Sequence, residues 1–459
     1  MSSPLNQLRS AVQMLALGAS GSVRRRSEPG YDAWLCRARW NERDVDRRPD
    51  YIVRPRSVDD MIAVIRTCRE HGLAVALRSG GHSFANAFIR RNGVLLDLSA
   101  LRALTIDSQR KRAIVGPGVT SRDLSRALAP YGLGFATGHS GTVGLGGFLL
   151  GGGLGINFGQ WGPMSAFHIK ALDVVTADGV LRRASAEENS DLFWAARGGG
   201  PMVFFAAVSF ELECHAAPAA ITARSLRLPL TRLADTLRSV ERTEPDPRLQ
   251  VMLAVIASDE SVAQQAPPRE VALTTLAFAE SITTASDLHA SIIDRLLPWA
   301  LAPASEEHAT GFTALHDHGD ATFGAGRYLA DNILTDHAER AAEILIAHLP
   351  SLPSLATLPI FIWRGSPSLP DGAFSARGRW YFSTYARWSD ANEDEVNQKW
   401  LRSLYDDLQP IASHCYINEF DLEYRSREVA RCFSEAAWQR LRELKQRHDP
   451  AGVFHDLAF

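Results

Sequence analysis

The chain has 459 residues, of which 46% are hydrophobic and 22% charged, a composition typical of soluble globular proteins with about two to three domains. Its net charge of −3 gives no electrostatic reason to bind nucleic acid or an anionic membrane. Five dispersed cysteines without a CxxC pair argue against a disulfide framework and a cysteine zinc site, and no apolar run is long enough to span a bilayer. We therefore expect a protein of the reducing cytoplasm, in which the N-terminal LALGASGSV is a helix or a disordered tail rather than a signal peptide.

The first part of the chain alternates between helices and short strands. A capping-box-like sequence at Ser57 begins a helix that ends at Gly72. A buried strand over Ala74–Leu77 follows and leads directly into the turn sequence Arg78-Ser-Gly-Gly-His-Ser83. Further strands are expected over Val94–Leu98 and Ala171–Thr176, and a short helix over Thr120–Ala129.

The segment from Ala127 to Ile169 has no charged residue and is rich in glycine. Linkers are usually polar, whereas this segment is interleaved with apolar residues such as Val143, Leu145 and Phe148. Glycine at this density is tolerated where the backbone must approach a ligand closely. The glycines form neither a GxGxxG after a strand nor a GxxxxGK[ST], which argues against a Rossmann fold and a P-loop. Backbone N–H groups in such turns suit a pyrophosphate.

A change of composition after Pro218 indicates a second domain in which strands and helices alternate. The expected strands are Gln250–Ala257, Val271–Phe278 and Trp380–Trp388, and the expected helices are Thr231–Arg242, Asp336–His348, Glu393–Leu408 and, near the C-terminus, Ser434–Arg447. Alternation along the last strand places Tyr381, Ser383 and Tyr385 on one face, which favours a pocket wall over a nucleic-acid stacking surface.

Histidines and aspartates gather at His316-Asp317-His318, with His308 and Asp320 nearby. A metal site is one interpretation, but neither an HExxH spacing nor a cysteine partner supports it. We favour a polar loop here and expect no metal.

Seven motifs occur in one order along the chain: RSGGHS (78–83), GTVGLGG (141–147), GGGLG (151–155), VVTADG (174–179), DLFWAARGGGP (191–201), YIN (416–418) and HDPAGVF (448–454). Each motif alone is a weak indication of a family. Together, in this order, they resemble the motifs of the berberine bridge enzyme-like FAD-linked oxidoreductases of the vanillyl-alcohol oxidase superfamily. The resemblance is strong over Arg54–Pro218 and moderate from Trp380 to the C-terminus.

The resemblance implies an α+β fold built around a bipartite FAD-binding domain of the PCMH type. Residues 46–218 and the tail 411–459 would form this domain, after an N-terminal extension over residues 1–45. Residues 219–410 would form a substrate domain, an antiparallel sheet flanked by helices.

In the family, the histidine of RSGGHS carries the flavin 8α-methyl group, which corresponds here to His82. Many relatives attach the flavin a second time through a cysteine, and this chain has Ser140 at that position. A serine lacks the nucleophilicity of a thiolate, so we expect covalent FAD through His82 only. The cofactor-binding residues that the resemblance implies are Arg78, Ser79, Gly80, Gly81, His82, Ser83, Thr142, Val143, Gly144, Gly146, Gly147, Gly152, Gly155, Val174, Val175, Tyr416 and Asn418, with the two valines at the adenine end.

The implied activity is oxidation of an alcohol, a sugar or a natural-product C–H bond by hydride transfer to FAD, an activity of secondary metabolism. Tyr416 is the candidate general base, and Tyr381 and Tyr385 are candidates to share or replace that role. O₂ is the expected electron acceptor, because a valine at the position of Val143 goes with oxygen reactivity in the family. The partners would be a small-molecule substrate and O₂, with no nucleic acid and no membrane.

Three alternatives remain open: a flavin-dependent cyclase or lyase without net redox change, a dehydrogenase that uses another acceptor, and a flavin-binding protein without turnover. Glu419 stands where an aromatic residue is common in the family, which should alter the substrate pocket. We expect the pocket to be lined by Trp363, Tyr381, Tyr385 and Trp388, which suits a sugar, a phenol or a polycyclic natural product.

Overall fold

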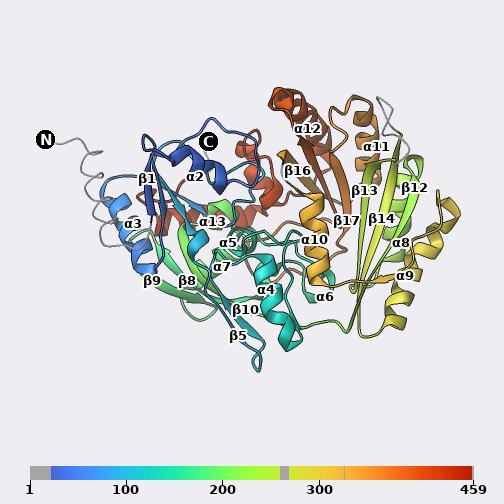
Figure 1. Ribbon diagram of the computed structural model, residues 1–459, viewed down its shortest axis with the longest axis horizontal. Helices are drawn as coiled ribbons and strands as arrows, with labels where there is room; N and C mark the ends of the chain where they lie inside the picture. Colours follow the sequence, from blue (N-terminus) through green and yellow to red (C-terminus); the bar gives the residue numbers. More distant parts are fainter. Residues whose placement is uncertain (1–21, 259–267, 325, 457–459) are drawn as a thin grey trace.

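The computed structural model describes residues 22–258, 268–324 and 326–456, which form two lobes (Figure 1). The first sheet of the first lobe consists, in spatial order, of β1 (Ser22–Arg25), β2 (Tyr51–Arg54), β4 (Val94–Asp97) and β3 (Val75–Arg78). β2, β4 and β3 are parallel, and β1 is antiparallel to β2. Helix α3 (Val58–Glu70) begins at the predicted capping box, in which Ser57 and Asp60 each accept a hydrogen bond from the other's backbone N–H.

A second, antiparallel sheet completes the first lobe. In spatial order it consists of β5 (Leu104–Asp107), β6 (Arg112–Val115), β10 (Phe205–Glu213), β8 (Ile169–Thr176) and β9 (Leu181–Ser185). The remaining elements of this part are α4 (Ser121–Leu128), α5 (Leu145–Leu150), α6 (Phe158–Trp161), α7 (Ser190–Ala196), and the pair β7 (Leu133–Gly134) and β11 (His215–Ala216). The glycine-rich segment is therefore folded into turns and short elements.

The second lobe is a seven-stranded sheet in which all neighbouring strands are antiparallel. Its spatial order is β15 (His308–Ala309), β12 (Ala220–Pro229), β14 (Arg269–Ala279), β13 (Leu249–Ala257), β17 (Leu358–Trp363), β18 (Trp380–Trp388) and β16 (Arg327–Thr335). One face is covered by α8 (Leu233–Thr243), α9 (Ile282–Leu296), α11 (Ala338–His348) and α12 (Asp394–Leu408) (Figure 1). The opposite face looks toward the first lobe. The predicted α+β fold with a helix-flanked antiparallel sheet is confirmed.

Both ends of the described chain join the first lobe. Residues 22–45 belong to the segment that the sequence analysis expects to be an N-terminal extension. In the structure, β1 pairs with β2, and helix α2 (Tyr31–Ala38) buries Tyr31, Trp34 and Leu35. After α13 (Glu435–His448), the tail returns to β3, where the Val75 N–H donates to the Val453 carbonyl. The LALGASGSV segment lies almost wholly outside the described residues. None of the described helices is both long and apolar enough to cross a bilayer.

The alternation predicted for β18 is confirmed. Tyr381, Ser383 and Tyr385 point away from the covering helices, whereas Thr384 contacts Tyr405 of α12. The polar loop predicted at residues 316–318 is wrong, because helix α10 (Phe312–Thr322) carries these residues. α10 packs against α4, which supplies partners for its polar side chains. Among the described residues, no three metal-ligating side chains gather into a possible metal site.

Candidate functional site

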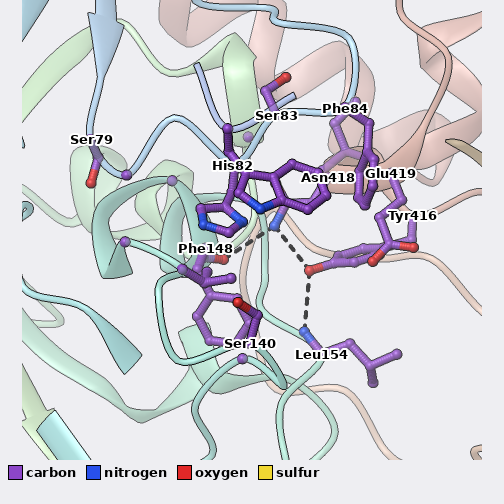
Figure 2. Close-up of a pocket in the computed structure, with 18 of the residues that line it drawn as sticks. Ser79, His82, Ser83, Phe84, Ser140, Phe148, Leu154, Tyr416, Asn418 and Glu419 are labelled. Carbon is purple, nitrogen blue, oxygen red and sulfur yellow. Dashed lines mark hydrogen bonds between the residues drawn. The ribbon is translucent and has the colours of Figure 1, made fainter. Parts of the chain in front are cut away.

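A cavity of about 490 Å³ lies between the glycine-rich turns of the first lobe and the uncovered face of the seven-stranded sheet (Figure 2). This volume is in the range of small-molecule sites. The motif residues that line it are Arg78, Ser79, Gly80, Gly81, His82, Ser83, Val143, Gly144, Gly146, Gly147, Tyr416 and Asn418. Tyr381, Tyr385 and Glu419 line it from the other side. The cavity thus brings together segments from both ends of the chain and from the second lobe.

Two glycine turns meet at the wall of this cavity. A Cβ on Gly80 would lie 2.4 Å from the Gly144 nitrogen, and a Cβ on Gly144 would lie 2.5 Å from the Gly80 nitrogen. Gly81 has φ +79°, and a Cβ there would lie 2.1 Å from the Ala38 carbonyl oxygen. Only glycine permits this approach, which leaves bare backbone facing the cavity.

His82 lies at the junction of the two turns. Its ring stacks on Trp40 with centroids 4.9 Å apart, and Trp40 stacks in turn on Tyr328. The Nε2 atom shares a hydrogen bond of 2.9 Å with Thr142 Oγ1, and among the described residues Nδ1 has no hydrogen-bond partner. Burial lowers the pKa of His82 to about 4, so the imidazole is neutral at physiological pH. The site therefore presents one free, uncharged ring nitrogen to the cavity.

Ser140 is engaged by the second lobe. Its hydroxyl donates to Asp320 Oδ1 at 2.5 Å, the same oxygen accepts from the Gly141 N–H, and Arg122 pairs with the other oxygen at 2.6 Å. Burial alone would raise the pKa of Asp320, but hydrogen bonds from Ser140 and Arg122 and the charge of Arg122 lower it. The loop is thus tied to an ionised carboxylate on α10.

The Tyr416 hydroxyl oxygen is surrounded by donors. It accepts hydrogen bonds from the Gly153 and Leu154 N–H groups, both at 3.2 Å, and from Asn418 Nδ2 at 2.9 Å (Figure 2). Such donors stabilise a phenolate. Burial and the neighbouring charge of Glu419 act in the opposite direction and raise the pKa of Tyr416 above its usual range. Within the described chain, the hydroxyl proton has no acceptor and remains available to a ligand.

From the sequence, Glu419 is connected with the substrate pocket but has no assigned catalytic or binding role. Its Oε2 atom accepts hydrogen bonds from Tyr385 at 2.7 Å, from Ser383 at 3.1 Å and from Tyr381. Burial raises the pKa of the carboxyl above its usual range, while these three hydroxyls act to lower it. The signal was present in the sequence, because the predicted strand face carries three hydroxyls and Glu419 follows the YIN motif.

Other predicted residues lie elsewhere. Thr142 contacts His82 without lining the cavity, Gly152 and Gly155 are packed against Phe374 and Ala136, and the side chains of Val174 and Val175 are fully buried in the core.

The predicted aromatic lining needs correction. Trp363 and Trp388 do not line the cavity: Trp363 packs against Trp380, and Trp388 donates to Asp394 beside α12. The strand period of two explains this, because both side chains share the face that the helices cover. The aromatic walls come instead from Trp40, Phe84, Phe88, Phe148, Phe323, Phe420 and Phe454 in addition to the tyrosines.

Comparison with known proteins is consistent with this geometry. Residues 49–185 match the family model of an FAD binding domain. FAD-linked oxidoreductase janO from Penicillium janthinellum is 28% identical over 94% of this chain and 95% of its own length. (R)-6-hydroxynicotine oxidase from Paenarthrobacter nicotinovorans is 33% identical over 44% of this chain and 43% of its own. A solved variant of berberine bridge enzyme in complex with (S)-reticuline superposes with a TM-score of 0.81 at 21% identity, covering 98% of each chain.

Proposed function

We propose that this chain, an FAD-linked oxidoreductase with the fold of berberine bridge enzyme, oxidises a small organic molecule at a C–H bond beside an oxygen or a nitrogen. The observation that carries the proposal is the single cavity in which a neutral His82 and the glycine turns face Tyr416 and Glu419. Bound FAD would accept the hydride and reduce O₂ afterwards.

The glycine turns and His82 fit the cofactor. Bare backbone at Gly80 and Gly144 suits the pyrophosphate, because no side chain intervenes. We infer a single covalent bond from His82 Nδ1, since Thr142 occupies Nε2 and burial keeps the imidazole neutral. Ser140, whose hydroxyl donates to Asp320, would contribute no bond, because a serine hydroxyl at neutral pH lacks the nucleophilicity of a thiolate.

Tyr416 and Glu419, here called the acid–base pair, would receive the substrate proton. Tyr416 presents its hydroxyl to the cavity, and Glu419 supplies the negative charge that a tyrosine alone lacks at neutral pH. The negative charge of Glu419 acts on Tyr416 and raises its pKa, so we assign the substrate proton to the pair and not to one of the two groups. Tyr381 and Tyr385 would support the pair through their hydrogen bonds to Glu419.

We further propose O₂ as the acceptor. Val143 lines the cavity beside the two glycine turns. A larger side chain at this position would occupy cavity space that O₂ needs in order to approach the flavin. The cytoplasm is the proposed location, because the five cysteines are unpaired and four of them are buried.

The direct test is anaerobic addition of candidate amines, alcohols, aldoses and phenolics to the purified yellow protein. Bleaching of the flavin by one class identifies a redox substrate. Formation of product without bleaching would overturn the proposal and indicate a lyase or cyclase.

A further inference from the structure

The part of the cavity beside the acid–base pair is bounded mainly by apolar side chains. Strands β13, β14 and β17 contribute Met252, Ala254, Leu276, Ile360 and Ile362. Phe84 and Phe323 close it, each in ring contact with Tyr385. A sugar would leave most of its hydroxyls without partners on such walls, at a substantial desolvation cost.

Among the described residues that line the cavity, Glu419 is the only one with a carboxylate. No lysine or arginine of the described chain forms an ion pair with it: Arg78 pairs with Asp97, and the buried Arg364 acts electrostatically on Tyr381 and Tyr416 instead. The three hydroxyls all bind Oε2. Oε1 accepts no hydrogen bond from a described residue, and it is not fully buried.

A carboxylate in such surroundings is costly unless a cation accompanies it. The protein supplies hydroxyl donors and no cation, so the missing partner is left to the ligand. Faces of Phe84, Phe323 and Tyr385 around the same space would add cation–π attraction. A neutral alcohol would gain neither the charge pairing with Glu419 nor the cation–π attraction.

We propose that the substrate is a hydrophobic amine that binds as its ammonium ion, with an N–H group donating to Glu419 Oε1. The inference rests on the proposed function. In the reaction, the N–H bond breaks and its proton passes to the acid–base pair. The adjacent C–H bond breaks, its electron pair leaves as hydride to the flavin, and a C=N bond forms. O₂ takes up the two electrons together with two protons, one delivered with the hydride and one from the acid–base pair, and leaves as hydrogen peroxide.

The test compares two probes that differ at one ring atom. 4-Phenylpiperidine is a cation at pH 7.5, and 4-phenyltetrahydropyran is its neutral ether. Calorimetric titration of the purified holoprotein should give a Kd at least about thirtyfold lower for the amine, as expected for a desolvated charge pair. The Glu419→Gln variant should lose this preference. Ser383→Ala, which removes one hydroxyl and leaves the charge, should keep it.

Equal affinities of the wild-type protein for the two probes would overturn the inference without recourse to any variant. An unchanged preference in Glu419→Gln would overturn it as well. The proposed function fails differently: no compound of any class would then bleach the flavin. Bleaching by a neutral alcohol together with equal probe affinities would keep the proposed function and discard the amine.

Discussion

At the scale of single residues, the proposed covalent bond between His82 and FAD can be tested directly. We expect acid precipitation of the wild-type protein to leave yellow colour in the pellet, and His82→Ala to release FAD into the supernatant. Ser140→Ala is the matched control in the facing loop and should keep the colour in the pellet, because Ser140 forms a hydrogen bond and no flavin bond. Free FAD from the wild-type protein would contradict the covalent bond.

Removal of the Tyr416 hydroxyl tests the acid–base pair. Tyr416→Phe should lower the rate of flavin reduction at least about a hundredfold, the low end for loss of a general base. Anaerobic stopped-flow absorbance measures this rate separately from reoxidation. A nearly unchanged rate would assign Tyr416 to packing. The flavin content of the variant serves as the control for site integrity.

Glu419 should determine the pH dependence of the same rate. The pair accepts a proton only when it carries a negative charge, so reduction should slow as the pH falls through the Glu419 pKa. Burial raises that pKa, despite the hydrogen bonds from Tyr381 and Tyr385, so the decline should begin at a higher pH than for an exposed carboxylate. Glu419→Gln should remove this acidic limb from the profile. A profile that is the same in both proteins would exclude Glu419 as part of the base.

Val143 tests access of oxygen. The Val143→Leu variant adds one methylene to a side chain that lines the cavity, where it would occupy space that O₂ needs in order to approach the flavin. Reoxidation of the reduced flavin by O₂ should slow markedly, while anaerobic reduction stays close to that of the wild-type protein. Slow reoxidation in the wild-type protein, with quinones accepting electrons efficiently, would make this enzyme a dehydrogenase.

At the scale of elements, helix α10 holds the loop opposite His82. Asp320 of α10 accepts from Ser140 and Gly141 and pairs with Arg122, whereas the more exposed Asp317 pairs with Arg122 alone. Asp320→Asn should lower the free energy of unfolding by about 1–3 kcal/mol, because partly buried donors lose a charged acceptor. Asp317→Asn should change it by less than about 0.5 kcal/mol. Chemical denaturation of the two variants measures both unfolding free energies. Equal decreases for Asp320→Asn and Asp317→Asn would contradict the conclusion that Asp320 holds the loop.

At the scale of the whole molecule, the two ends of the chain are joined by a buried ion-pair cluster. Arg43 and Arg47 both pair with Glu423 of the C-terminal tail, at 2.6 and 2.9 Å, with all three side chains at most 12% exposed. Glu423→Gln removes the carboxylate charge that two buried guanidinium groups share and should cost about 3–5 kcal/mol of unfolding free energy. The exposed pair of Asp46 with Arg91 provides the control, since Asp46→Asn should be nearly neutral.

Local sequence determined most of the elements and the cofactor half of the site. The helix at Ser57 begins where its capping box predicts, and β18 has the predicted bounds Trp380–Trp388, because capping and alternation are properties of neighbouring residues. The glycines of the motif from residue 78 to residue 83 carry their backbone constraint in the sequence itself. The role of His82 came from the family resemblance of this motif and stays a prediction.

The tertiary structure alone decided the substrate half. Glu419 meets Tyr381, Ser383 and Tyr385 across more than thirty residues of chain, and no local pattern encodes such a contact. Trp40 stacks on His82, although it belongs to a segment that the sequence analysis places outside the FAD-binding domain. A side chain's protonation state and partners depend on what burial places around it, and burial is set by the packing of the two lobes.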